Sequence, residues 1–163
     1  MSALPEGTKA PDFSLPTLDS ATFSLSEALT RGPVVLAFFK VSCPVCQYAF
    51  PFLERIHQAH PGLTIVGVSQ HPQKETLAFN KEYGISFPTL LDDTKTYSVS
   101  NAYGLTNVPS IFWIDPSGRI EVSSVGWVKK EVEDVHRRAN TLAHSAAKPL
   151  FDAKEQVADF RAG

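Results

Sequence analysis

The chain has 163 residues, of which 43% are hydrophobic and 20% are charged, a composition typical of one globular domain with a full core. Its formal net charge of −2 offers no basic surface for nucleic acid. No apolar run is long enough to cross a membrane. The first residues lack the basic and apolar stretches of a signal peptide, so we expect a cytoplasmic protein. An exported protein whose leader had been removed would have the same sequence.

The N-terminal region, residues 5–25, is rich in proline and contains two short apolar pieces, which predict an extension with a small hairpin. Ser24 and Glu27 have the spacing of a capping box and predict a short helix that ends near Gly32. Residues 34–40 are apolar on both faces, which is typical of a central, buried strand.

A helix is predicted after this strand, because apolar residues recur at positions 46, 49, 50, 53 and 56. Pro51 lies inside the helical pattern and should kink it. The elements predicted beyond it are a strand at 63–68, a helix at 73–83, a short strand at 88–92, a helix at 94–103, hairpin strands at 111–114 and 120–125, a helix at 129–146 and weak helical character at 152–160.

Alternation of strands and helices predicts parallel strands covered on both faces, and the hairpin adds antiparallel ones. We therefore expect an α/β fold with a central mixed sheet flanked by helices. No linker or internal repeat divides the chain. The prediction is a single domain over 1–163, with its core at about 8–146 and a C-terminal tail at 147–163.

Cys43 and Cys46 are the only cysteines, and they stand two residues apart where the buried strand passes into the helix. A thiol at the start of a helix faces free N–H groups and the positive end of the helix dipole. Both favour the thiolate, which is the nucleophile, over a free thiol with a pKa of ~8.5. The pattern predicts dithiol–disulfide exchange, and Pro44 suits the first helical turn because its missing N–H costs nothing there.

Several segments together resemble the thioredoxin-fold redoxin group, which holds the TlpA/ResA-like thiol–disulfide oxidoreductases and the related AhpC/TSA peroxiredoxins. They are Ala10-Pro11-Asp12-Phe13, residues 34–46, Pro51, residues 87–92 and Val108-Pro109 with the hairpin behind it. The resemblance covers roughly residues 8–145. It implies a thioredoxin-like fold, a cis bond before Pro109, and substrate binding by Val108, Pro109, Pro44 and Val45.

The resemblance is incomplete at the positions that handle protons. Thioredoxin has an aspartate where this chain has Ala37, and ResA-like proteins have a glutamate where it has Ala49. The usual tryptophan before the first cysteine is Ser42. No base for Cys46 can be named. Lys40 is a possible thiolate stabiliser if its side chain turns toward the site, although a solvated lysine at a strand end is the plainer interpretation.

The sequence assigns the nucleophile to Cys43 and the resolving thiol to Cys46, because residues three apart on a helix are neighbours. Expected partners are protein disulfides and an unidentified electron donor. We expect no cofactor apart from a Cys43–Cys46 disulfide. Phe39, Val41, Val45 and Val108 are candidates for an apolar docking rim.

A zinc site is disfavoured, because zinc normally takes four ligands and the two cysteines supply two. The histidines do not stand beside the cysteines at ligand spacing; they are His57, His60, His71, His136 and His144.

Two other functions stay open. The first is a peroxiredoxin-like thiol peroxidase with Cys46 as the peroxidatic residue. Against this function, the chain has Cys43 at the position where peroxiredoxins carry the serine or threonine hydroxyl that holds the peroxide. It has Pro109-Ser110 where they carry the active-site arginine. The second is a non-enzymatic redox-sensing adaptor, which could use the tail at 147–163 for packing or dimerisation.

Overall fold

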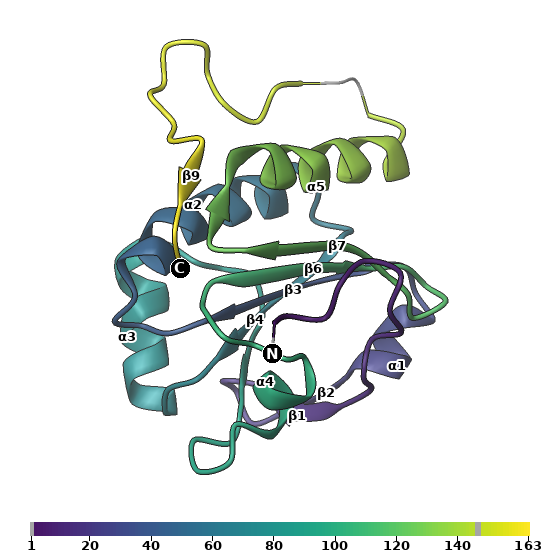
Figure 1. The fold of residues 1–163 in the computed structure, drawn as a ribbon, viewed down its shortest axis with the longest axis vertical. Helices are drawn as coiled ribbons and strands as arrows, with labels where there is room; N and C mark the ends of the chain where they lie inside the picture. Colours follow the sequence, from purple (N-terminus) through teal and green to yellow (C-terminus); the bar gives the residue numbers. More distant parts are fainter. Residues whose placement is uncertain (1, 146–147) are drawn as a thin grey trace.

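A five-stranded mixed sheet forms the centre of the molecule in the computed structural model, which describes residues 2–145 and 148–163 (Figure 1). The strand order is β5-β4-β3-β6-β7. The first three strands run parallel, whereas β6 is antiparallel to β3 and β7 is antiparallel to β6. The strands are β3 (Val34–Phe39), β4 (Thr64–Ser69), β5 (Thr89–Leu91), β6 (Ser110–Ile114) and β7 (Ile120–Val125). The predicted mixed sheet and its hairpin are confirmed.

Helices cover both faces of this sheet (Figure 1). α2 and α5 lie together on one face, and α1 and α4 lie on the other with the N-terminal hairpin. The helices are α1 (Leu25–Leu29), α2 (Pro44–Ala59), α3 (Gln73–Tyr83), α4 (Ser98–Ala102) and α5 (Lys129–Leu142). Pro51 lies inside α2, and the helix continues past it to Ala59.

β3 supplies apolar side chains to two separate cores. Val35 and Phe39 join the cluster beneath α2, α3 and α5, whereas Val34 and Phe38 join the cluster beneath α1 and α4. All six residues of the strand are buried. This two-sided burial is the reason for the uninterrupted apolar run, and it fixes the end of β3 firmly beneath the cysteine loop.

The N-terminal extension forms the predicted hairpin from β1 (Ser14–Pro16) and β2 (Thr22–Ser24). It also reaches both outer strands of the sheet. Thr17 forms an antiparallel bridge with Leu90 of β5. At the other side, the Gly7 N–H donates to the Ile120 carbonyl at 2.8 Å.

Three predictions about helices were wrong or only partly right. The helix expected at 94–103 is confined to α4, because the Asp93 carboxylate accepts the amides of Lys95 and Thr96 in a local turn and Tyr97 has φ 49°. The helix expected at 129–146 ends at Leu142, and residue 146 lies outside the described part. The weak helix expected at 152–160 is wrong.

That last segment is irregular and ends in a short strand, β9 (Phe160–Arg161), which pairs antiparallel with β8 (Trp127–Val128). The pairing replaces helix formation because it satisfies backbone groups of both segments. In Figure 1 the yellow C-terminal segment crosses from α5 back over the start of α2.

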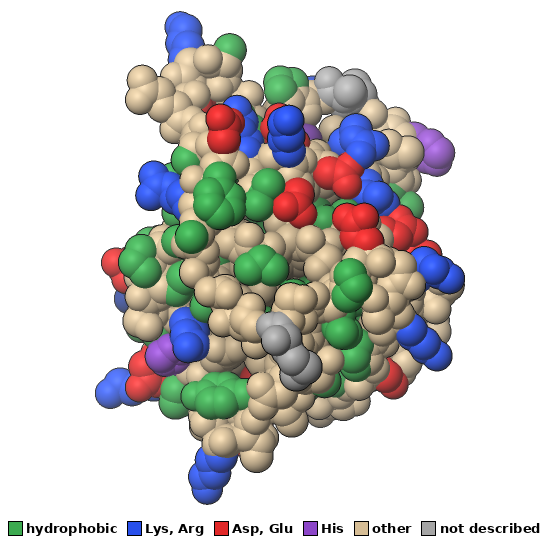
Figure 2. Space-filling model, in the orientation of Figure 1, with side chains coloured by type: hydrophobic (Ala, Val, Ile, Leu, Met, Phe, Trp, Pro, Cys, Tyr) green, Lys and Arg blue, Asp and Glu red, His purple; other side chains and the backbone are tan. Residues whose placement is uncertain are grey.

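Charged side chains of both signs are mixed on the face drawn in Figure 2. Arg138, for example, pairs with Glu121 and with Asp134. Within residues 2–145 and 148–163, the helices are too short or too polar to span a membrane.

Candidate active site

Cys43 occupies the N-cap position of α2, immediately after the loop that leaves β3. Its backbone is extended, and its Sγ accepts a hydrogen bond from the Cys46 N–H at 3.1 Å. Pro44, at the first helical position, has no N–H to satisfy. The sulfur therefore receives a first-turn amide and lies at the positive end of a 16-residue helix.

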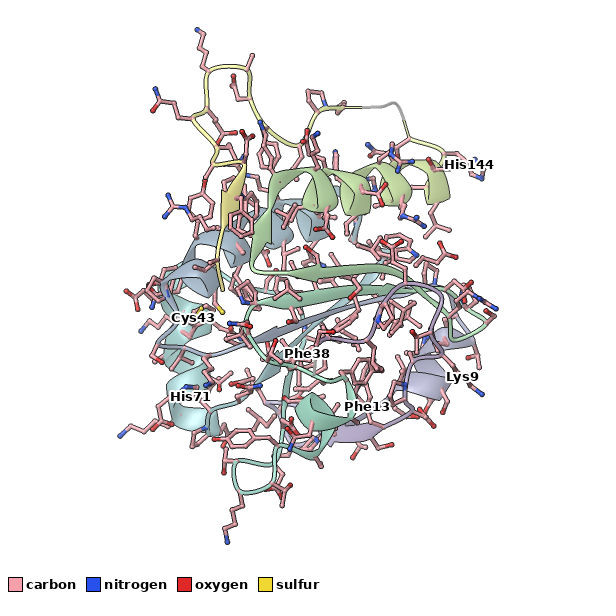
Figure 3. All side chains as sticks on the ribbon, in the orientation of Figure 1. Lys9, Phe13, Phe38, Cys43, His71 and His144 are labelled. Atoms are coloured by element: carbon pink, nitrogen blue, oxygen red, sulfur yellow. The ribbon has the colours of Figure 1, made fainter. Side chains whose placement is uncertain are left out.

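Cys43 also contacts the loop before β6. Its Sγ donates to the Val108 carbonyl at 3.5 Å, across 65 residues of sequence. The Val108–Pro109 peptide bond is cis, as predicted. The fold thus brings together the two sequence features that the resemblance implied, and Cys43 remains half-buried between them at the start of α2 (Figure 3).

Cys46 lies one turn along α2 and is completely buried. Loss of solvent raises the pKa of its thiol far above the ordinary value, and the contact with Cys43 raises it further. The two thiols therefore have different environments, one partly open to solvent and one closed.

Among residues 2–145 and 148–163, no carboxylate acts on the buried thiol. Ala37 and Ala49, the positions at which the family resemblance implies acids, are fully buried in the same apolar cluster as Cys46. In the part of the chain that the structure describes, the ionisable side chains that act on the Cys46 thiol are Cys43 and Lys40. A proton leaving Cys46 therefore has no buried acid–base partner.

Lys40 has an exposed side chain, whereas its backbone is part of the cysteine loop. Its carbonyl accepts the Cys43 N–H at 3.3 Å. The side chain lies with Asn101 and Val108 along a cavity of about 240 Å³ on the side of the cis-proline loop.

The predicted apolar rim is only partly present. Phe39 is not in it, because its ring is fully buried and packs 4.4 Å from Phe50, between ring centroids. Val41, Val45 and Val108 are half-buried and pack against the core. These three side chains, together with the exposed Pro44, offer apolar surface beside Cys43.

Sequence reasoning missed the aromatic side chains that border the site from α2 and β8. The Tyr48 hydroxyl accepts the Ala158 N–H at 3.0 Å, and the Trp127 indole donates to the Ala158 carbonyl at 2.6 Å. The Arg161 guanidinium lies 4.2 Å from the centroid of the Tyr48 ring. No periodic pattern signals these contacts, because they join segments more than 30 residues apart.

Metal ligands do not cluster in residues 2–145 and 148–163: no three His, Cys, Asp or Glu side chains are placed to hold an ion. His60 packs against His136, with ring centroids 5.7 Å apart, on the far part of α2. The chemistry of the site thus depends on the two sulfurs.

Comparisons with known proteins identify the group to which this arrangement belongs. The AhpC/TSA family model matches residues 7–123. The chain belongs to the AhpC/TSA family. It is 31% identical to the thioredoxin-like protein YneN of Bacillus subtilis over 134 residues, which are 78% of this chain and 76% of YneN.

The thiol-disulfide oxidoreductase ResA of Halalkalibacterium halodurans is a further relative of this AhpC/TSA protein. The two are 30% identical over 132 residues, 78% of this chain and 73% of ResA. The thioredoxin domain of a thiol-disulfide oxidoreductase from Bacteroides vulgatus has the same fold, with a TM-score of 0.74, 21% identity and coverage of 83% and 98% of the two chains. The predicted thioredoxin-like fold and oxidoreductase class are confirmed.

Proposed function

We propose that this AhpC/TSA protein exchanges a Cys43–Cys46 dithiol with the disulfides of protein partners, with Cys43 as the nucleophile and Cys46 as the resolving thiol. The observation that carries the assignment is the contrast between the two sulfurs. Cys43 is half-buried and accepts a helix amide, whereas Cys46 is closed to solvent.

The exchange takes two steps. The Cys43 thiolate attacks one sulfur of the partner's disulfide, so that a mixed disulfide forms and the partner's other sulfur leaves as a thiolate. Cys46 then loses its proton and attacks the Cys43 sulfur, which breaks the mixed disulfide. The partner gains two electrons and becomes a dithiol, and the protein is left with the Cys43–Cys46 disulfide.

Proton transfer is supplied from outside the apolar pocket in this proposal. The Cys46 proton passes to water or to the partner's departing thiolate, because Ala37 and Ala49 offer no carboxylate. We expect resolution of the mixed disulfide to be slower than in relatives that have a buried acid.

Partner docking is assigned to the surface around Cys43. Val108 and Pro109 provide backbone beside the sulfur, and Pro44 and Val45 provide the helix side of the contact. Lys40 has a minor role, since its exposed ammonium adds positive charge near the thiolate.

A peroxidase mechanism that begins at Cys46 is disfavoured by burial. Peroxide would have to reach a sulfur with no exposed surface and a raised pKa. The adaptor function has less support than the exchange reaction, because the tail that could serve it packs back on the domain through β9.

A cytoplasmic location, expected from the sequence, gives the reaction a direction. Thiols are kept reduced there, so the protein would act as a reductant. An intracellular dithiol donor would then reduce the Cys43–Cys46 disulfide again. A strongly negative potential of the Cys43–Cys46 couple supports this direction, and a potential near that of oxidising folding catalysts contradicts it.

Single cysteine variants test the assignment of roles. Cys43→Ser should abolish insulin reduction, and Cys46→Ser should accumulate mixed disulfides that mass spectrometry detects. Peroxide consumption that survives Cys43→Ser and is lost in Cys46→Ser would reverse the roles. An unmodified protein without activity on any disulfide would reject the exchange function.

A further inference from the structure

The C-terminal strand is anchored on the domain next to the cysteine loop. β9 pairs with β8 in the register Trp127 with Arg161 and Val128 with Phe160. The Lys129 N–H donates to the Asp159 carbonyl at 2.9 Å, which extends the pairing by one bond. The segment at residues 158–163 therefore runs as an extended peptide along the chain that links β7 to α5.

Side chains from α2 and β8 fix the beginning of this segment. Ala158 is held at both backbone groups, by the Tyr48 hydroxyl and by the Trp127 indole. Arg161 stacks on the Tyr48 ring, two residues along α2 from Cys46. A cation over an aromatic face adds attraction at an exposed site without fixing the segment permanently.

The end of the segment reaches the same carbonyl as the nucleophile does. A Cβ added at Gly163 would lie 2.5 Å from the Val108 oxygen, the atom to which Cys43 Sγ donates. The Asn107 side-chain amide donates to the Gly163 carbonyl at 3.0 Å. In Figure 3 the β9 strand descends toward the labelled Cys43.

This position conflicts with the docking of a partner. Under the proposed function, a partner must lay the chain that carries its disulfide beside Val108 to reach Cys43. An extended peptide with main-chain pairing is a common way of binding at such an edge. Residues 158–163 already cover the surface beside Val108. They do so in an extended conformation, with a cation over Tyr48 and a small residue against Val108.

The hold on the segment is weak enough to be reversible. β9 has two residues, both exposed, and Phe160 leaves 62% of its surface in solvent. Such short, exposed pairings belong to the least stable parts of a fold and open without global unfolding.

We propose that residues 158–163 are an intramolecular ligand of the surface beside Cys43, formed by Tyr48, Trp127 and Val108, and that a partner's extended segment displaces them. This surface then favours partner peptides with a cationic residue two places before a small one, the pattern of Arg161 and Gly163. This inference rests on the proposed function for its kinetic test, but not for its binding test.

Variants of the segment test the competition. Gly163→Ala forces its Cβ against Val108 backbone, and Arg161→Ala removes the stacking on Tyr48. Both should lower KM for insulin with kcat unchanged; for Arg161→Ala the change should be roughly twofold to fivefold, the factor for one exposed cation–π contact. Ala162→Ser is the matched control, because Ala162 is exposed, and should leave KM unchanged. An unchanged or raised KM in both test variants overturns the proposal.

A second measurement needs no enzymatic activity. In the full chain labelled with nitrogen-15, an excess of an unlabelled synthetic peptide of residues 157–163 should bind in place of the tethered segment, so that the amide NMR signals of residues 158–163 move to the positions of a disordered peptide. The same peptide with Arg161→Ala should bind more weakly. Absence of binding, or equal binding of the two peptides, contradicts the proposal. Loss of activity in every protein with binding retained would reject the exchange function alone.

Discussion

The backbone N–H of Cys46 donates to the sulfur of Cys43 over 3.1 Å. The main-chain N–H of Cys46 therefore stabilises the Cys43 thiolate, whereas the Cys46 thiol is the group that attacks the mixed disulfide at Cys43. A serine at position 46 keeps the amide and removes the resolving sulfur. For this reason Cys46→Ser separates the two contributions cleanly, whereas a proline there would remove the amide as well.

Alkylation should distinguish the two thiols in the reduced protein. We expect iodoacetamide in native buffer to label Cys43, because it is half-buried at a loop, and to leave Cys46 unlabelled. Burial and a raised pKa both keep Cys46 as an inaccessible thiol. Peptide mass spectrometry measures the two rates. Equal labelling without denaturant would contradict the assignment of an open and a closed sulfur.

A carboxylate placed at Ala37 should speed resolution and weaken the fold. Ala37→Asp puts an acid into the buried cluster that holds Cys46, where it can take the thiol proton. We expect faster decay of a mixed disulfide, measured by quenching and mass spectrometry, and a loss of about 3 kcal/mol in unfolding free energy. Ala37→Asn is the control, since it has the shape without the charge. The same decay rate in both variants would show that proton transfer is not limiting.

Replacement of Gly67 on β4 by a residue with a side chain should lower the free energy of unfolding. A Cβ there would lie 3.2 Å from Phe39 Cε1 and 3.4 Å from both Phe50 Cε2 and Phe87 Cε1. We expect Gly67→Ala to lower the unfolding free energy in urea by about 1–3 kcal/mol through overpacking.

Gly62→Ala is the matched control for this crowding, because a Cβ at Gly62 meets nothing within 4 Å. We expect a change within about 0.5 kcal/mol. Similar losses in the two variants would mean that backbone effects of glycine replacement, and not the aromatic cluster, set the cost.

Glu155 makes the attachment of the C-terminal segment sensitive to acid. Hydrogen bonds from Arg55 lower the pKa of its carboxyl to about 2 from an ordinary 4.5. Because the folded pKa is the lower one, the ion pair contributes fully above pH 4.5 and its contribution is lost as pH falls through about 2.

The measurement compares unfolding of the unmodified protein and of Glu155→Gln from neutral pH to pH 2. Their difference should stay constant down to about pH 4.5 and shrink below it. A difference that does not depend on pH would show that the carboxylate charge contributes nothing to the attachment.

The sequence was sufficient for the elements that carry a local signal. The apolar run at 34–39 could only be a strand buried on both faces, and the cysteines at its end had to meet the first turn of a helix. The glycine and proline residues around 115–118 marked the hairpin correctly. The cis bond before Pro109 has no local signal of its own and was implied by the family resemblance alone.

The sequence was insufficient where distant segments decide the outcome. The pairing of Trp127 with Arg161 joins two-residue strands that have no periodicity. Phe39 looked like a rim residue because it stands next to the loop, yet its ring turns inward onto Phe50. The helix predicted at 94–103 does not form before Tyr97, because the Asp93 carboxylate accepts the amides of Lys95 and Thr96 in a competing turn.

The bonds that the N-terminal extension makes to the outer strands have a consequence for how the protein behaves in concentrated solution. Thr17 beside Leu90, and Gly7 beside Ile120, occupy the backbone groups through which one sheet could add to another. An edge strand with unpaired backbone groups can pair with the edge strand of another molecule and so start aggregation. Removal of residues 1–24 would therefore expose both edge strands of the sheet at once. We expect the shortened protein to aggregate even if it keeps its redox activity.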